Sequence, residues 1–198
     1  GNDNYNASAN KTTFEVIKTE TNFNIIVNDS SITYGDPITV TQSLPGDATG
    51  SITYYFANGT IIKVITVDES FILAGLNAGT YTIYANYSGD ANYAPAQDNI
   101  TITVAKASNE IMVYAPDAAH DENALIIIIA DVDGEYNLNI NGKKFIIHVL
   151  NGIGTANLGI MDTGNYTVQV IFAGNDNYNA SANKTTFEVI KTETNFNI

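Results

Sequence analysis

The sequence contains no cysteine and no tryptophan, only four prolines, and 15% charged residues. Without cysteine the chain can form neither disulfide bonds nor thiolate metal sites, although this does not decide its compartment. Long hydrophobic runs are also missing. The run from Leu125 to Ala130 is far shorter than the roughly 18 residues of a membrane span, and it predicts a strand.

Basic residues are scarce as well. Eight Lys and Arg oppose 21 Asp and Glu, which gives a net charge of −13. Nucleic-acid binding requires clustered Lys and Arg against phosphate, so we expect no nucleic-acid partner. The charge suits a soluble, self-repelling surface protein. No signal peptide is visible, and we expect any export signal or anchor to lie outside these residues.

The abundant residues are Asn, Thr, Ile and Tyr. Because β-branched and aromatic side chains suit a pleated, half-buried surface, this composition predicts an all-β fold. Apolar side chains alternate with polar ones in four segments, and each set is expected on one strand face: Tyr81, Ile83, Ala85, Tyr87; Tyr166, Val168, Val170, Phe172; Ile100, Ile102, Val104; Phe187, Val189. Turn signals separate such segments at Asn58-Gly59, Asp133-Gly134, Asn141-Gly142 and Asn151-Gly152.

Internal repeats define the organisation. Residues 1–25 and 174–198 are identical, at an offset of 173 residues. A weaker repeat lies inside this period: Gly79-x-Tyr81 recurs as Gly164-x-Tyr166, and Gly89-Asp-Ala-Asn-Tyr93 recurs as Gly174-Asn-Asp-Asn-Tyr178. Two diverged units of about 85 residues therefore form one period.

Units of this length, rich in short strands, predict tandem immunoglobulin-like β-sandwiches of about seven strands each. We expect the first complete domain at residues 19–105 and the second at 106–191. Residues 1–18 are then the last strand of a preceding domain, and residues 192–198 begin the next repeat. No Gly/Ser-rich linker separates the domains, so the array is predicted to be semi-rigid.

The run from Leu76 to Tyr93, with Gly79-x-Tyr81-Thr followed by Gly-Asp-x-Asn-Tyr, resembles the Ig-like repeat domains of prokaryotic surface proteins. It looks most like the adhesin-like proteins of methanogenic archaea. The resemblance implies an extracellular, cell-surface module with a spacer, adhesive or wall-associated role. Such repeats share no catalytic residues, so none is transferred and no enzyme is expected. The chain departs from antibody-type domains in lacking the Cys…Trp…Cys core.

Asn-x-Ser/Thr sequons are the most numerous candidate sites. They predict N-glycosylation of a secreted surface, although polar strands rich in Asn and Thr would also contain them. The nine positions are Asn6, Asn10, Asn28, Asn58, Asn86, Asn99, Asn165, Asn179 and Asn183.

Tyr81 and Tyr166 could stack against a ligand. The favoured interpretation is a core Tyr whose hydroxyl bonds to nearby backbone, as in a tyrosine corner. The two histidines, His120 and His148, lie far apart in sequence. We expect His148 to point outward and neither to serve as a metal ligand or general base.

Two acidic segments could in principle bind calcium, although no cofactor is expected. Asp131-x-Asp133-Gly134 resembles a calcium loop, but position 12 from Asp131 is Gly142 where an EF-hand needs Glu. The sequence favours a hairpin turn there. The stretch from Asp117 to Glu122 carries three carboxylates, and it is the alternative calcium site, at a domain end.

The run Leu125-Ile-Ile-Ile-Ile129 is apolar on both strand faces. With Leu125, Ile127 and Ile129 assigned to the core, Ile126 and Ile128 are predicted to point outward and to share an outer face with Ile146 and Leu150. Exposed apolar patches mark contacts, so this face is predicted to make a lateral or inter-subunit contact, unless the domain's own loops cover it.

Two functional hypotheses follow. In the first, the repeats are a passive stalk, fibre or filament shaft whose partners are adjacent repeats of the same protein, with homotypic lateral or end-to-end assembly. In the second, the repeats themselves bind a cell-wall glycan, a host glycan or another cell.

Overall fold

The computed structural model describes residues 1–192; residues 193–198, where most of the predicted next repeat falls, lie outside the described part. Residues 1–192 form strands joined by turns, bends and irregular segments, with no helix among them, as predicted for an all-β chain. They contain no helix that is long and apolar enough to cross a bilayer. The chain forms two compact units, each built around one β-sandwich.

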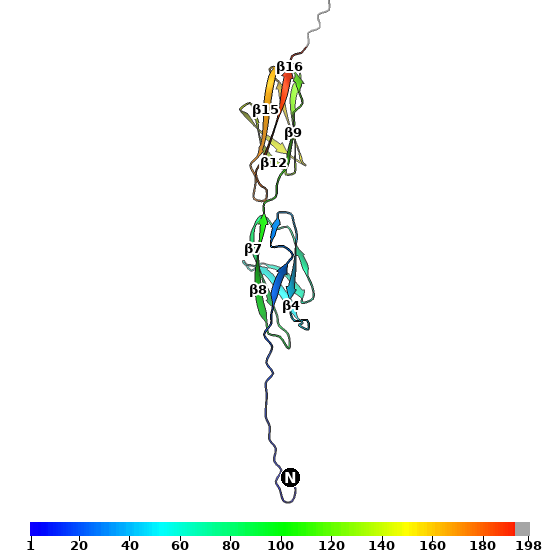
Figure 1. The fold of residues 1–198 in the computed structure, drawn as a ribbon, viewed down its shortest axis with the longest axis vertical. Helices are drawn as coiled ribbons and strands as arrows, with labels where there is room; N and C mark the ends of the chain where they lie inside the picture. Colours follow the sequence, from blue (N-terminus) through cyan, green and yellow to red (C-terminus); the bar gives the residue numbers. More distant parts are fainter. Residues whose placement is uncertain (193–198) are drawn as a thin grey trace, which may run out of the picture. The chain divides into compact units, whose positions relative to one another are not determined.

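The first sandwich consists of a three-stranded sheet, in the order β1-β3-β6, and a five-stranded sheet, in the order β2-β8-β7-β4-β5 (Figure 1). Its strands are β1 (Asn24–Val27), β2 (Ser31–Thr33), β3 (Ile38–Ser43), β4 (Ser51–Phe56), β5 (Ile61–Thr66), β6 (Phe71–Leu73), β7 (Gly79–Tyr87) and β8 (Ala96–Ala105).

The second sandwich repeats this plan, with sheets β14-β11-β9 and β10-β16-β15-β12-β13. Its strands are β9 (Ile111–Tyr114), β10 (Ala118–Ala119), β11 (Asn123–Ala130), β12 (Gly134–Ile140), β13 (Lys143–Val149), β14 (Ile153–Ile160), β15 (Gly164–Phe172) and β16 (Ser181–Ile190). Each sandwich has one strand more than the predicted seven, because the very short β2 and β10 pair in parallel with the last strand.

The predicted alternation along the long strands is confirmed. In β7 the side chains of Ile83, Ala85 and Tyr87 are buried, and the equivalent residues of β15 follow the same pattern. The apolar side chains near the ends of β8 and β16 are buried too. In each sandwich these residues meet the inner face of the smaller sheet, so the core lies between the two sheets. The second core comprises Ile111, Ala118, Ala124, Ile126, Ile128, Ala130, Val132, Tyr136, Leu138, Ile140, Ile147, Val149, Val168, Val170, Phe172, Phe187 and Val189.

Two of the predicted Asn-Gly turns have positive φ at both central residues, 46° and 92° at Asn141-Gly142 and 51° and 78° at Asn151-Gly152. This geometry matches the twist of the flanking strands and is accessible to Asn and Gly at little cost. The hairpin predicted at Asp133-Gly134 is wrong, because β11 and β12 belong to different sheets. The segment between them crosses from one sheet to the other.

The orientation predicted for β11 is also wrong. Ile126 and Ile128 are fully buried, whereas Leu125 and Ile129 are 38% and 44% exposed. In a run of five apolar residues no polar side chain marks the solvent face, so the pairing with neighbouring strands decides which face is buried. Ile128 pairs with Gly154, where an added Cβ would lie only 2.9 Å from the Ile147 side chain of the opposite sheet. This pair therefore faces the core.

Buried tyrosine hydroxyls anchor each core. Tyr54 donates to Gln42 Oε1 at 2.9 Å, and burial raises the pKa of Tyr54 to about 12. In the second sandwich Tyr136 donates to Val132 O at 2.6 Å and accepts from Asn109 Nδ2 at 2.9 Å. Because a buried hydroxyl without a partner costs free energy, these bonds fix where both rings lie.

Candidate functional site

The Gly-Asp-x-Asn-Tyr segment of the first sandwich is a loop organised by one carboxylate. Asp90 accepts hydrogen bonds from the backbone N–H groups of Thr49 at 2.7 Å and of Asn92 and Tyr93 at 2.8 Å. Tyr87 Oη also donates to it at 3.3 Å. The bond from Thr49 is the largest cause that holds the pKa of Asp90 well below its ordinary value. The motif thus fixes the loop before the last strand.

The same loop occurs twice more in the chain with Asn in place of Asp. Asn175 Oδ1 accepts from the backbone N–H groups two and three residues later, both at 2.9 Å. Asn2 Oδ1 accepts the two equivalent bonds at 3.0 Å. Short polar side chains that bond to nearby backbone in this way stabilise turns locally. We therefore interpret the motif as structural.

Three of the carboxylates suggested for calcium, those of Asp131, Asp133 and Asp117, accept hydrogen bonds from backbone N–H groups. Asp131 accepts from Glu110 N at 2.8 Å, and Asp133 accepts from the N–H groups of Asn151 and Gly152 at 2.9 Å. The Gly152 bond is the main cause that lowers the pKa of Asp133. Asp117 accepts from Glu188 N. Within residues 1–192, no three His, Asp or Glu side chains form a group suited to a metal ion.

The remaining candidates, two tyrosines and two histidines, contact neighbouring residues of their own sandwich. Tyr166 donates its hydroxyl to the backbone carbonyl of Asp162, four residues earlier, at 2.9 Å, which is the predicted tyrosine-corner bond. Tyr81 lies against the Phe56 ring. His148 is exposed and 3.9 Å from Glu135, and His120 Nδ1 lies 2.8 Å from Met161 O.

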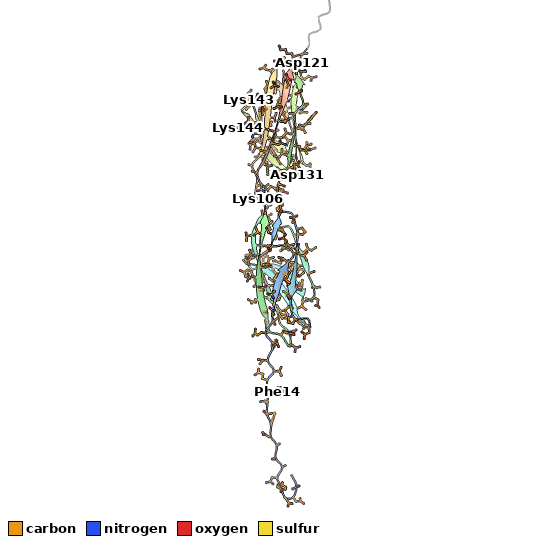
Figure 2. All side chains as sticks on the ribbon, viewed as in Figure 1. Phe14, Lys106, Asp121, Asp131, Lys143 and Lys144 are labelled. Atoms are coloured by element: carbon orange, nitrogen blue, oxygen red, sulfur yellow. The ribbon has the colours of Figure 1, made fainter. Side chains whose placement is uncertain are left out.

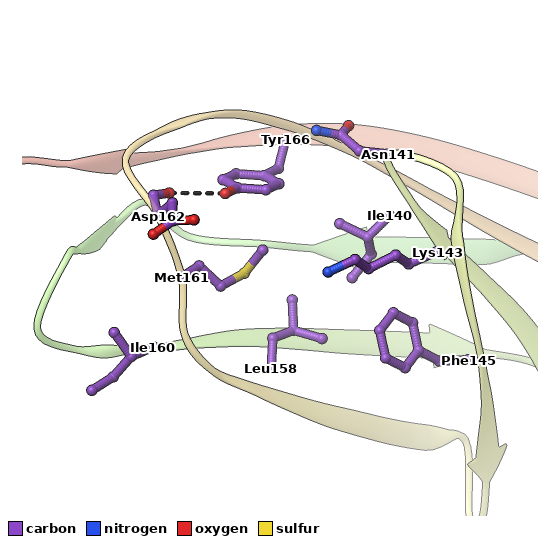
Figure 3. A pocket seen from close by; sticks show the side chains of 9 residues that line it. All are labelled: Ile140, Asn141, Lys143, Phe145, Leu158, Ile160, Met161, Asp162 and Tyr166. Atoms are coloured by element: carbon purple, nitrogen blue, oxygen red, sulfur yellow. Dashed lines mark hydrogen bonds between the residues drawn. The ribbon is translucent and has the colours of Figure 1, made fainter.

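One pocket lies at the edge of the second sandwich, between the β12–β13 hairpin and the segment that joins β14 to β15. Figure 3 shows its floor of aliphatic and aromatic side chains beside the Tyr166 ring, whose hydroxyl is bonded to Asp162. Its volume is about 270 Å³, and Lys143 supplies the one ammonium group among its nine lining residues. Such a pocket can hold a small ligand, but it places no nucleophile beside a base.

The sequon asparagines are exposed at eight of the nine positions, and Asn86 is half-buried. Their amide nitrogens differ in availability. Asn183 Nδ2 donates to Ile111 O at 2.6 Å and Asn179 Nδ2 donates to Lys106 O at 3.2 Å. Asn58 lies in the turn between β4 and β5, where its Oδ1 accepts from Thr60 N at 3.0 Å. Among these three positions Asn58 is the most accessible for modification.

An apolar surface covers the outer face of the β14-β11-β9 sheet. We call it the outer apolar face; its members are exposed or half-buried, and they are Met112, Tyr114, Leu125, Ile127, Ile129 and Ile153. Ile127 pairs with Tyr114, and Ile129 pairs with both Met112 and Ile153, so these side chains are neighbours. The predicted members Ile146 and Leu150 are exposed, but they lie on or beside β13 in the other sheet.

In the first sandwich the central strand β3 carries polar residues on the equivalent face, flanked by the exposed Ile26 and Ile72 of β1 and β6. The strand pairing defines the equivalent positions. Thr41 of β3 pairs with Ile26 of β1 in the same way as Ile127 of β11 pairs with Tyr114 of β9, so Thr41 corresponds to Ile127. Two residues further on, Ser43 corresponds to Ile129. Sequence reasoning missed the outer apolar face because it treated the isoleucine run alone. An alignment of Leu125–Ile129 with Ile-Thr-Val-Thr of β3 would have shown which side chains point outward, because the two Thr side chains of β3 are on the solvent side of that strand.

A family model described as "Bacterial Ig-like domain (group 3)" matches residues 25–105, which contain the first sandwich from its first strand to its last. The predicted Ig-like sandwich fold is thereby confirmed. No curated protein matches the chain significantly.

Three solved structures are similar to this chain at low sequence identity. Fibronectin(III)-like modules of CbhA from Clostridium thermocellum share 13% identity with a TM-score of 0.38 over 88% of this chain and 99% of that one. A 1.5-MDa bacterial ice-binding adhesin shares 13% identity with a TM-score of 0.38 over 88% of this chain and 66% of that one. The titin z1z2 domains share 11% identity with a TM-score of 0.47 over 90% and 100% of the two chains.

Acid titration is expected to weaken the first sandwich through Asp90. Its folded-state pKa lies below the ordinary 3.8, so its stabilising contribution is present above that pH and is lost as pH falls toward the lowered pKa. Asp90→Asn, which copies Asn175, should retain the loop and lose this part of the acid dependence. Hydrogen exchange of β4 and β7 as a function of pH measures it.

Asp3→Asn, on the segment outside either sandwich, is the matched control and should leave the acid profile unchanged. An identical acid profile in Asp90→Asn and the unmodified chain would contradict the assignment.

Proposed function

We propose that this chain is part of an extracellular structural array, a cell-surface stalk, fibre or filament of an adhesin-like protein. The observation that carries the proposal is the nested repetition: two diverged sandwiches form one period, and residues 1–25 recur without change as 174–198. Repetition of small sandwiches extends a chain outward with contacts mostly between neighbours. The proposal includes the domain limits 19–105 and 106–191 and a preceding domain completed by residues 1–18.

Further support comes from the chemistry of the described residues. The candidate motifs stabilise loops and turns, because the side chains of Asp90, Asn175 and Asp133 accept hydrogen bonds from the chain's own backbone. The match of residues 25–105 to a bacterial Ig-like domain fits a surface location. The similarity to adhesin-like proteins of methanogenic archaea is part of this proposal.

The second candidate function is saccharide binding by the repeats themselves. The pocket beside Tyr166 favours it, because an aromatic ring edge, an ammonium group and a mixed polar and apolar lining suit a sugar ring. The nine residues that line this pocket all belong to the second sandwich, so a saccharide bound there would occur once in each period.

A glycan array probed with the full 198-residue chain separates the two functions. The shaft proposal expects no saccharide to bind above the level of a Lys143→Ala, Tyr166→Phe control. A saccharide that binds the unmodified chain saturably and loses affinity in this control would favour the adhesive function instead.

We propose N-glycosylation at exposed turns, with Asn58 as the leading position. Expression in a host with an oligosaccharyltransferase should add mass to the chain, and Asn58→Gln should lose the mass of one glycan. The matched control is Asn86→Gln, which should change nothing, because Asn86 is half-buried and accepts a hydrogen bond from Tyr55 Oη. A peptide map without glycan on Asn58 would contradict the assignment.

The outer apolar face is proposed to make lateral contacts between copies. Because Thr41 and Ser43 occupy the equivalent positions of β3 in the first sandwich, Ile127→Thr with Ile129→Ser should keep the fold and weaken self-association by removing exposed apolar surface. Sedimentation velocity over a range of concentrations measures the change.

Thr41→Ile with Ser43→Ile is the reciprocal variant, and it should strengthen association through the first sandwich. Equal self-association in all three proteins would show that this face makes no contact.

A further inference from the structure

The edge strands of the sheets differ in how they are protected against pairing with another chain. An edge strand presents unpaired N–H and C=O groups, and natural sheets limit this exposure with very short strands, bulges, prolines or charged side chains. Among residues 1–192, the edge strands β1, β2, β6, β9 and β10 have four residues or fewer. The longer edge strands are β5, β13 and β14.

Irregular pairing protects two of these longer edges. The register between β4 and β5 shifts at Tyr54 and Tyr55, and the register between β11 and β14 shifts at Ala124 and Leu125. β5 also carries Lys63 opposite Tyr54, whose side chain is buried, so Lys63 lies on the core side of its strand. A bulge and a charge on the core side both hinder the approach of a further strand.

The edge strand β13 has neither a bulge nor a charge at its centre. Its seven residues pair with β12 from Gly134↔Val149 to Ile140↔Lys143 without a shift of register. Lysines occupy only its first two positions, where Figure 2 labels them. The other residues are apolar apart from His148, and none is proline or glycine. Within residues 1–192, no strand pairs with the outer edge of β13.

The strand pairing shows which residues of β5 and β13 correspond. Ala85 of β7 and Val170 of β15 lie at the same distance from the glycine that begins each strand. Each pairs with one residue of the neighbouring strand, and that residue pairs in turn with Lys63 in the first sandwich and with Phe145 in the second. A phenylalanine of β13 therefore replaces the lysine that protects β5.

The exposed side chains at the centre of β13 are apolar. Ile146 lies on the outer face of the sheet and is 63% exposed, whereas Phe145 lies on the core side and is 41% exposed. The sequence predicted Ile146 and Leu150 as contact residues, and the structure places both at this edge, where both are exposed. An exposed, apolar and regular edge strand is suited to pairing with a further strand.

We propose that β13 pairs with β13 of a second copy of this chain, antiparallel and about a two-fold axis at Ile146. This register overlaps the two strands over their full length, with Lys143 of one copy opposite Val149 of the other. Ile146 then lies opposite Ile146 on the outer face, and Phe145 lies opposite Ile147 on the core side. Main-chain hydrogen bonds join two five-stranded sheets into one. The inference goes beyond the proposed array and is independent of whether the repeats bind saccharide.

Charge complementarity favours a second copy over an unrelated strand. In this register Lys144 lies opposite His148 of the other copy, on the outer face. The His148 ring is 3.9 Å from Glu135 Oε1, and the two residues pair across β12 and β13. Each Lys144 ammonium therefore approaches the Glu135 carboxylate of the other copy, and the two-fold axis provides this attraction twice. It opposes the repulsion between two chains that each carry a net charge of −13.

The test uses full-length variants in an Ile127→Thr, Ile129→Ser background, which weakens association through the outer apolar face. Sedimentation velocity over a range of concentrations should show a two-copy species of this background protein. Ile146→Lys and Ile146→Glu each place like charges opposite one another at the two-fold axis, so each variant alone should lose that species. Because the side chain of Ile146 is exposed, both variants should fold. An equimolar mixture of the two should recover the two-copy species, since lysine then lies opposite glutamate.

Val64→Lys is the matched control, because Val64 follows Lys63 in β5 as Ile146 follows Phe145 in β13, and it is also exposed. This variant should keep the two-copy species. Hydrogen exchange provides the second readout, and protection should rise with protein concentration in β13 but not in β5. A background protein that stays single at every concentration, charge variants that associate as it does, a mixture that recovers no pair, or an equal loss in Val64→Lys would overturn the proposal.

Discussion

Each sandwich depends on the pairing of its last strand with the strand before it. In the second sandwich β16 pairs with β15 over the length of both strands, and it buries Phe187 and Val189 between the sheets. It also reaches the opposite sheet, where Asn183 donates to Ile111 O. Without β16, the edge of β15 would present unpaired N–H and C=O groups, and the core would open along one side. The last strand of the sequence therefore closes the edge of its own sheet and covers the core that the two sheets share.

The loop before this strand determines where it enters. Asp90 in the first sandwich and Asn175 in the second bond to the backbone two and three residues later, and this directs the chain into the last strand. The carboxylate of Asp90 also accepts a hydrogen bond from Thr49 N. The second sandwich has Asn175, and therefore no carboxylate, at this position. The conformation of the loop is local, so it survives in residues 1–5 where no sandwich surrounds it.

The sequence alone predicted the features that depend on local chemistry or on a clear alternation of apolar and polar residues. The inward faces of β7 and β15, the Asn-Gly turns and the Tyr166 hydroxyl bond all follow from short segments. The orientation of β11 did not follow, because Leu125 to Ile129 contain no polar residue to mark a face. That orientation depends on pairing with Gly154 and on the close approach of Ile147, which are tertiary facts. The outer apolar face was misplaced for the same reason.

The two copies of one strand sequence separate intrinsic preference from tertiary context. Ser181–Ile190 is a strand, whereas the identical residues 8–17 are extended and unpaired with any element of the described chain. Propensity alone thus does not make a strand of Ser-Ala-Asn-Lys-Thr-Thr-Phe-Glu-Val-Ile; packing against β15 and β10 does. A repeat whose closing strand requires a neighbouring surface cannot be stable as an isolated segment. The same residues thus form a strand only where the other strands of a sandwich surround them.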